Sequence, residues 1–183
     1  MNLIAVLEDL LREPSRCGTS RVIAIDGRAG AGKTTLAHEL FLAFGIERKV
    51  EVIHMDEIYS GWEDALGQRL TDTLTALLEN ISRGAKFQLP IFNWENSSFD
   101  STREVSPVDL LILEGVGSAQ SIVREYTSAT IWLDVEASIG LRRVLVRDGN
   151  SLATQMQQWQ LDEDAHFAND KTQQKADFVL STV

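Results

Sequence analysis

A glycine-rich stretch near the N-terminus constrains the fold of this chain more than any other feature. Residues 27–34 read Gly-Arg-Ala-Gly-Ala-Gly-Lys-Thr, which fits the spacing G-x-x-x-x-G-K-[ST]. The glycines let successive backbone N–H groups point inward around an anion, and a following helix adds the positive end of its dipole. Lys33 can reach the outer phosphates of a nucleotide, and the Thr34 hydroxyl can ligate Mg²⁺. The predicted phosphate-binding residues are Gly27, Gly30, Ala31, Gly32, Lys33, Thr34 and Thr35.

The segments on either side of the glycines fit the same interpretation. Residues 21–26 form a short apolar run, which is typical of a buried parallel strand. Residues 34–44 carry apolar side chains at helical spacing, and Gly45 predicts the end of that helix. Strand, loop and helix therefore follow in the order that a phosphate loop requires, which argues against a glycine-rich surface turn.

The rest of the chain alternates between strand and helix patterns. Apolar runs predict strands at 50–54, 110–114, 130–135 and 176–180, and helical spacing predicts helices at 3–12, 64–82, 137–147 and 152–168. The alternation indicates a single α/β domain over residues 1–183, with a parallel sheet inside a three-layer α/β/α fold of the P-loop type. Ligands of such sheets bind beyond the carboxyl ends of the strands. We therefore expect the glycine loop, residues 54–56, Glu114 and Asp134 to converge on one site.

Composition narrows the classes of partner. The 183 residues include 27 acidic and 17 basic side chains, and the net charge of -10 argues against a nucleic-acid-binding surface. Cys17 is the only cysteine, so an intrachain disulfide is excluded. No apolar run approaches the length of a membrane span, and the N-terminal segment lacks the basic start of a secretory signal. We expect a cytoplasmic protein without a membrane partner. The apolar side of residues 3–12 could pack on its own domain or on a second copy, in a homodimer.

Glu114 ends the buried run at residues 110–114 and is a candidate for positioning a metal. Mg²⁺ prefers oxygen ligands in near-octahedral geometry and retains several waters. Thr34, Glu114 and two phosphate oxygens would leave room for those waters. The alternative is that Glu114 caps a helix or forms a turn.

Asp56 follows the strand at 50–54 and is the candidate proton acceptor. A carboxylate at the tip of that strand can take the proton of a hydroxyl that attacks a phosphate. An exposed loop acid or a helix cap is the alternative for Asp56. Asp26 is the competing base, although it can also be a turn residue or lie behind a metal site. His54 belongs to the strand run and is predicted to be structural.

Four segments of the chain resemble uridine kinase-like P-loop kinases, a group that also includes phosphoribulokinase and bacterial pantothenate kinase. These segments lie at residues 26–35, 54–59, 90–94 and 113–115, and the resemblance extends over roughly residues 20–181. It implies that Asp56 is the catalytic base, that Glu114 is associated with Mg²⁺ and that Tyr59 lines the acceptor pocket. Phe92 falls where uridine–cytidine kinases have a tyrosine near the base, so one polar contact is missing.

The resemblance also implies a helical lid that closes over ATP, at about residues 136–165. Arg143 and Arg147 are four residues apart and share one helix face, where they can neutralise phosphate charge. The alternative is a solvated basic face. The arginine spacing is one residue longer than in uridine–cytidine kinases, and a glutamine-rich segment replaces the arginines expected downstream. These departures leave the acceptor open.

Aromatic residues supply the last indication of a ligand. Tyr59, Trp62, Phe92 and Trp94 lie between sheet ends and can stack on a base or a sugar, or pack in the core. Together the patterns predict an ATP- and Mg²⁺-dependent kinase that phosphorylates a hydroxyl of a small molecule, with a nucleoside as the leading acceptor. The alternatives are another small hydroxyl substrate, such as a sugar, polyol or vitamin, and a regulatory P-loop ATPase that is not a kinase.

Overall fold

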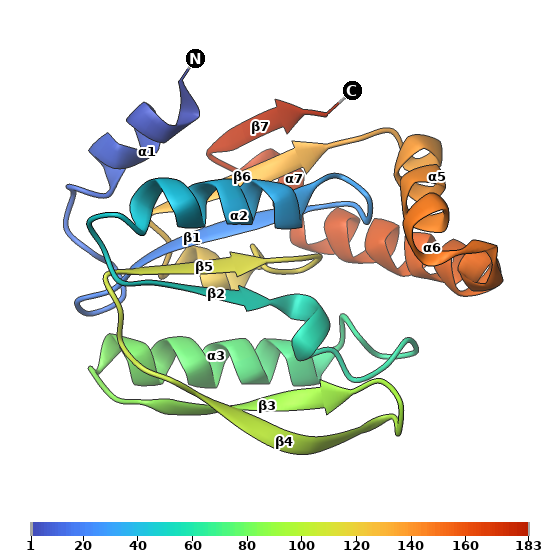
Figure 1. The fold of residues 1–183 in the computed structure, drawn as a ribbon, viewed down its shortest axis with the longest axis horizontal. Helices are drawn as coiled ribbons and strands as arrows, with labels where there is room; N and C mark the ends of the chain where they lie inside the picture. The colour runs from blue at the N-terminus through green and yellow to red at the C-terminus, as the bar shows by residue number, and fades with distance from the viewer. Residues whose placement is uncertain (1, 183) are drawn as a thin grey trace.

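Five parallel strands form the central sheet of the computed structural model, which describes residues 2–182 (Figure 1). The strand order is β2-β5-β1-β6-β7, and each neighbouring pair is parallel. The strands of this sheet are β1 (Arg21–Gly27), β2 (Val50–His54), β5 (Leu110–Glu114), β6 (Ala129–Asp134) and β7 (Phe178–Ser181). The helices are α1 (Leu3–Leu10), α2 (Lys33–Phe44), α3 (Gln68–Ser82), α4 (Ser121–Arg124), α5 (Ala137–Asp148), α6 (Ala153–Asp170) and α7 (Thr172–Lys175). Two short 3₁₀ turns, η1 (Met55–Glu57) and η2 (Asn150–Leu152), complete the connections.

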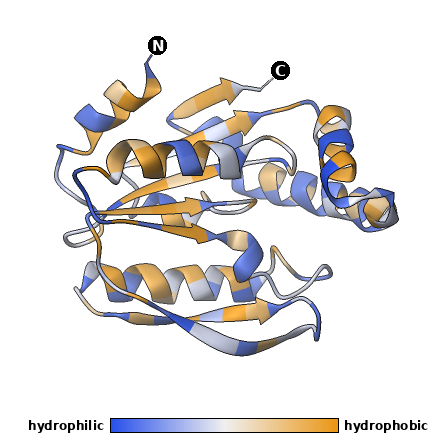
Figure 2. Cartoon of the chain, viewed as in Figure 1, coloured by the Kyte–Doolittle hydropathy of each residue, from blue (hydrophilic) through white to orange (hydrophobic). Residues whose placement is uncertain are grey.

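The two faces of the sheet are covered by different helices, because successive strand residues point to opposite sides. In β1, Val22 and Ala24 join a cluster with α3, α4 and α6, whereas Ile23 and Ile25 join a cluster with α1 and α2. Figure 1 shows α2 and α3 on opposite sides of the sheet, and Figure 2 shows its strands as predominantly hydrophobic. The predicted three-layer α/β/α fold is confirmed. The apolar side of α1 packs on its own domain through Leu7, which is fully buried.

Helix α3 begins four residues later than the sequence predicts. Gly67 is extended at the N-cap of α3, and the predicted first turn at residues 64–67 is irregular instead. Leu70, Leu74 and Leu77 then face the core as their spacing predicts. The later start leaves residues 58–67 as a loop beside the carboxyl ends of the strands.

An antiparallel hairpin, β3 (Phe87–Asn93) and β4 (Ser98–Val105), was not predicted from the sequence. Strand β4 is mostly polar and exposed, so it lacks the apolar signal of a strand (Figure 2). The hairpin packs on α3 and is tied to the edge of the main sheet by Arg103, which pairs with Glu51 and Glu57. Tertiary contacts, rather than local hydrophobicity, therefore stabilise this element.

Asp134 does not join the other strand-end residues, which corrects the expectation that it converges with them. Its carboxylate accepts hydrogen bonds from Trp132 and Gln173, and its backbone carbonyl accepts the N–H of Thr182. Asp134 therefore holds the last strand and α7 in place, and it does not line a cavity with the phosphate loop.

Candidate active site

The glycine motif forms the predicted loop between β1 and α2. Gly32 has φ of 93° at the N-cap of α2, a conformation that favours glycine. A side chain on Gly30 would overlap the carbonyl oxygen of Gly140, so the loop and α5 approach closely only because both residues are glycines. The Lys33 ammonium donates hydrogen bonds to the carbonyls of Gly27 and Arg28, at 2.7 and 2.8 Å. The strand–loop–helix prediction is confirmed.

Glu114 lies directly beside this loop. Strand β5 sits between β1 and β2, and the register pairs Glu114 with Ile25 on one side and His54 on the other. The Thr34 hydroxyl donates to Glu114 Oε1 at 3.1 Å. A hydroxyl and a carboxylate in contact next to a phosphate loop are the donors that Mg²⁺ prefers, so these residues fit that ion.

His54 has a closer relation to this site than its sequence position suggests. Its Nδ1 contacts Glu114 Oε1, so His54 is not simply part of the strand. The hydrogen bond to Glu114 is the main cause that raises the pKa of His54, and burial opposes it. The sequence pattern that could have indicated this contact is that residues 54 and 114 both end predicted strands. Their adjacency required the order β2-β5, which the sequence does not give.

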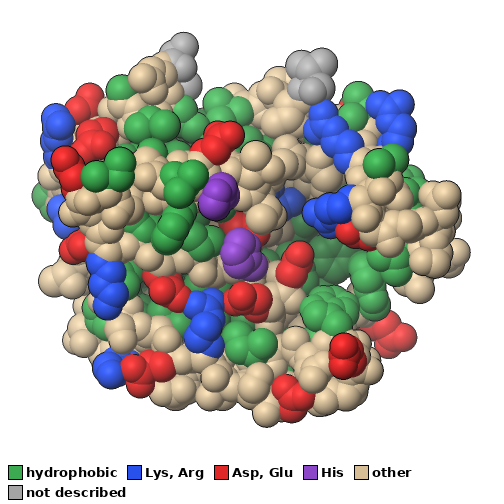
Figure 3. Space-filling view, viewed as in Figure 1, with side chains coloured by type: hydrophobic (Ala, Val, Ile, Leu, Met, Phe, Trp, Pro, Cys, Tyr) green, Lys and Arg blue, Asp and Glu red, His purple; other side chains and the backbone are tan. Residues whose placement is uncertain are grey.

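A cavity of about 310 Å³ opens between the carboxyl ends of the strands and the helices α5 and α6. Figure 3 shows a hollow on this side of the molecule, with hydrophobic side chains inside it and acidic side chains around it. Its volume lies at the small end of the range for ligand pockets. Predicted residues that line the cavity are Gly30, Gly32, Lys33, Thr34, Thr35, Asp56, Tyr59, Trp94, Glu114 and Arg147. A larger cavity of about 520 Å³, on the far side of Trp62 and Trp159, contains no phosphate-loop residue.

Asp56 lies in η1 with its side chain in the cavity and open to solvent. Partial removal of water raises the pKa of Asp56, and the nearby Glu114 carboxylate adds to this, while Lys33 and Arg147 lower it. A carboxylate with a raised pKa, close to a phosphate site, is a good candidate proton acceptor.

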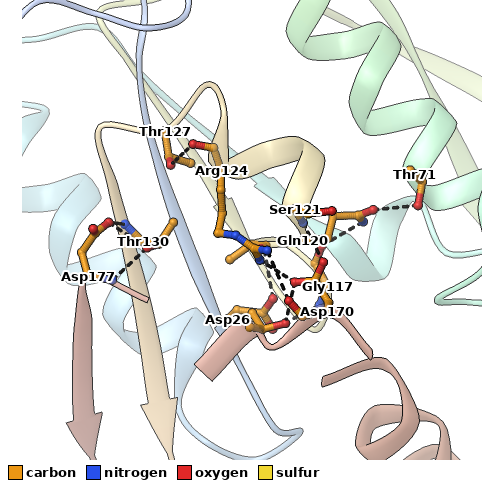
Figure 4. A network of polar contacts seen from close by, with 12 residues as sticks. Asp26, Thr71, Gly117, Gln120, Ser121, Arg124, Thr127, Thr130, Asp170 and Asp177 are labelled. Atoms are coloured by element: carbon orange, nitrogen blue, oxygen red, sulfur yellow. Dashed lines mark hydrogen bonds and ion pairs between the residues drawn. The ribbon is translucent and has the colours of Figure 1, made fainter. Parts of the chain in front are cut away.

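Asp26, the competing base, is fully buried and does not line the cavity. Its carboxylate accepts the backbone N–H groups of Gly27, Gly117 and Ala119, at 2.7, 3.1 and 2.9 Å. Figure 4 shows Asp26 inside this network, next to Gly117. Asp26 therefore fixes the turn after β5 against the phosphate loop.

Four aromatic side chains, which we call the aromatic wall, line the same cavity as the loop: Tyr59, Trp62, Trp94 and Trp159. Trp62 lies 5.4 Å from Trp94 and 5.9 Å from Trp159 between ring centroids, and Tyr59 lies 5.3 Å from Trp159. The Tyr59 hydroxyl donates to the Val116 carbonyl at 2.8 Å, and the Trp94 indole donates to the Asp56 carbonyl at 2.9 Å. Trp159 was missed because it lies in the glutamine-rich segment, far along the chain from the other three.

Phe92 and Arg143 lie outside the lining, in contrast to the sequence interpretation. Phe92 is buried behind Trp94 and in contact with Phe99, so it supports the wall instead of facing the cavity. Arg143 donates to the Gly30 carbonyl at 3.3 Å, whereas Arg147 lines the cavity and pairs with Asp148 at 2.7 Å. The two arginines therefore have different surroundings.

The fold and the loop define this molecule as a P-loop nucleotide-binding protein. Residues 63–181 match the model of the phosphoribulokinase / uridine kinase family, and the chain belongs to that family. A uridine kinase of Clostridium botulinum (strain Langeland / NCTC 10281 / Type F) is 30% identical over 146 residues, which cover 70% of this chain and 69% of the relative. A uridine kinase of Clostridium perfringens is 27% identical over 149 residues, 74% of this chain and 71% of the relative. The solved structure of a possible uridine kinase from Bacillus stearothermophilus has a TM-score of 0.66 at 22% identity, covering 97% of this chain and 96% of that one.

The protein is therefore a kinase that transfers a phosphoryl group to a hydroxyl of a small acceptor. Within residues 2–182, no helix is long and apolar enough to cross a membrane.

Proposed function

We propose that this kinase transfers the γ-phosphoryl group of ATP to a hydroxyl of a nucleoside, with Mg²⁺ as the metal. The observation that carries the proposal is the placement of Asp56 in one cavity with Lys33, Thr34 and the aromatic wall. A phosphate donor at the loop and a planar acceptor at the wall would meet at the Asp56 carboxylate.

Five polar residues of the cavity have a role in this reaction. The loop N–H groups and Lys33 hold the outer phosphates, and Arg147 adds positive charge from α5. Thr34 and Glu114 would hold Mg²⁺ through their oxygens, and the bound ion would neutralise phosphate charge. Asp56 accepts the proton of the acceptor hydroxyl as its oxygen bonds to the γ-phosphorus and the β–γ bridging oxygen leaves with ADP.

The lining supports an uncharged, planar acceptor. Tyr59, Trp62, Trp94 and Trp159 present aromatic surface, which stacks on flat rings. Lys33 and Arg147 are the cationic residues of the lining. In the proposed reaction, Lys33 pairs with the nucleotide phosphates and is not free to bind a phosphate on the acceptor. A nucleoside fits these conditions better than an acceptor that already carries a phosphate, and the uridine kinases among the relatives agree with it.

Two alternatives remain to be tested against this proposal. A sugar, polyol or vitamin hydroxyl would use the same Asp56 and the same loop. A regulatory ATPase without an acceptor would need the loop and the metal site, but it would have no use for the aromatic wall beyond packing.

A panel of acceptors tests the proposal. The purified protein, ATP and Mg²⁺ are incubated with single nucleosides, sugars, polyols and vitamins, and ADP release is measured together with the mass of the product. We expect one or more nucleosides to gain 80 Da, the mass of one phosphoryl group, with ADP formed in equal amount. ADP release without any phosphorylated acceptor, at the same rate for all compounds, would instead support the ATPase.

A further inference from the structure

Glu163 is a fully buried carboxylate that the proposed reaction does not use. It lies in α6, within the predicted lid region at about residues 136–165. Burying a carboxylate is costly unless hydrogen bonds compensate for the lost water. Burial is the main cause that raises the pKa of Glu163. The hydrogen-bond donors around Glu163 should therefore show what this buried carboxylate does.

One oxygen of Glu163 holds two such partners at the same time. Glu163 Oε1 accepts the backbone N–H of Ala29 at 2.7 Å and the indole N–H of Trp159 at 2.6 Å. The other oxygen, Oε2, has no hydrogen bond and lies 3.7 Å from the guanidinium of Arg28. The direct link therefore runs through Oε1 alone.

The two donors belong to two different parts of the cavity lining. Ala29 is the third residue of the phosphate loop, and Trp159 is part of the aromatic wall. The N–H of Ala29 is directed at α6, so the conformation of the loop at this residue depends on where Glu163 lies. The orientation of the Trp159 ring depends on the same oxygen.

We propose that Glu163 is a positioning residue that couples the phosphate loop to the aromatic wall, so that nucleotide binding orients Trp159 for the acceptor. The inference rests on the proposed nucleotide site. A nucleotide that orders the loop fixes the N–H of Ala29, which fixes Glu163 and then the indole of Trp159. Affinity for nucleotide and orientation of the wall are then linked, as thermodynamic coupling requires.

The test measures Mg-ADP binding by calorimetry and by tryptophan emission. The Trp159 contribution to emission is the difference between the unmodified protein and Trp159→Phe. We expect Glu163→Ala to raise the Kd of Mg-ADP about 3- to 10-fold, because one loop hydrogen bond is lost, and to abolish the Trp159 part of the emission change. Glu163→Gln keeps an oxygen that accepts both N–H groups, so it should stay within about twofold of the unmodified protein.

Asp164→Asn is the matched control. Asp164 also pairs with Arg28, from the next position of α6, but it contacts neither Ala29 nor Trp159. Its Kd and emission change should equal those of the unmodified protein. An effect of Asp164→Asn as large as that of Glu163→Ala would assign the coupling to Arg28 and overturn the role of Glu163.

Hydrogen exchange on the unmodified protein covers the case in which Glu163→Ala fails to fold. Mg-ADP should slow amide exchange in residues 160–167 of α6, and unchanged exchange there would overturn the inference. If Mg-ADP binds but Glu163→Ala folds and keeps the normal Kd and Trp159 signal, the coupling is wrong and the proposed function stands. If Mg-ADP does not bind the unmodified protein at all, the proposed function fails, and this inference fails with it.

Discussion

The phosphate loop and the aromatic wall line one cavity, but they are built in opposite ways. The loop with its strand and helix occupies the continuous segment 21–44, and backbone N–H groups do much of its work. The wall takes Tyr59 and Trp62 from a loop, Trp94 from a hairpin and Trp159 from α6. The proposed function assigns the nucleotide phosphates to the contiguous loop, and it assigns the acceptor to side chains from distant segments.

Substitutions in the two regions should therefore have different effects. Changes on the loop side alter charge at the phosphates and the metal, so they should reduce turnover or nucleotide affinity whatever the acceptor is. Changes in the wall should alter the acceptor's KM and leave the nucleotide's KM close to normal, apart from changes that break the link through Glu163.

Asp56→Asn should produce the largest effect on turnover, because it removes the proposed catalytic base. Loss of a positioned base costs about 10²–10⁴-fold in kcat. The kcat of the unmodified enzyme should also fall as pH decreases, with a midpoint above the ordinary aspartate range. The pKa of Asp56 is raised, so the base becomes protonated at a higher pH than an ordinary aspartate would. Asp56→Asn should abolish this acid limb.

Steady-state rates between pH 4 and 9 and calorimetry with an ATP analogue measure both effects. Nucleotide affinity should stay near normal in Asp56→Asn. Turnover within a few-fold of the unmodified enzyme would mean that another group takes the proton.

Lys33→Ala should have the second largest effect, a loss of nucleotide affinity or of turnover. Hydrogen bonds to charged groups contribute about 1.5–3 kcal/mol, which corresponds to about 10- to 100-fold in nucleotide affinity or turnover. Lys33 also bonds two loop carbonyls, so a melting curve must accompany the calorimetry. Unchanged affinity and unchanged turnover would contradict the phosphate role of this loop.

Glu114→Gln should raise the Mg²⁺ concentration for half-maximal rate by about tenfold, while keeping the size of the side chain. Glu57→Gln is the matched carboxylate control, since Glu57 pairs with Arg103 and does not line the cavity. A Mg²⁺ titration of the rate, carried out on both variants, should separate them. Identical titrations would make Glu114 a structural acid.

Trp94→Ala should have the smallest effect and the most selective one. Loss of an aromatic contact of about 0.5–1.5 kcal/mol predicts a 2- to 10-fold rise in the acceptor's KM, with little change for ATP. Phe92→Ala removes the support behind Trp94, so it should lower the melting temperature more than it changes KM. Steady-state kinetics on the acceptor found in the panel decide this, and equal effects on both substrates would indicate that the wall only packs.

Much of the sheet and the loop could be predicted because their signals are local. A buried parallel strand is an apolar run, and a phosphate loop is a fixed spacing of glycines followed by lysine and threonine. Asp56 and Glu114 followed from the rule that ligands bind where parallel strands end, and both line the cavity. The same rule placed Asp134 there wrongly. Strand β6 does lie next to β1, but the Asp134 carboxylate bonds to Trp132 and Gln173 and does not line the cavity.

The residues that escaped prediction depend on contacts between distant segments. The hairpin strand β4 is polar and is tied down by Arg103. His54 acquires its contact with Glu114 from the strand order, and Trp159 enters the wall because α6 folds back over the sheet. No spacing in the sequence marks these relations.

Local sequence patterns were enough to predict the phosphate loop, the parallel sheet and the two carboxylates beside the loop, because hydrophobic periodicity and glycine spacing act within a few residues. Tertiary structure decided which side chains face the cavity. It buried Asp26 and Phe92, directed Arg143 to the loop backbone and brought Glu163 to Ala29 across 134 positions of the chain. The physical reason is that a side chain's role depends on burial and on its hydrogen-bond partners, and both are set by segments that meet only in the folded chain.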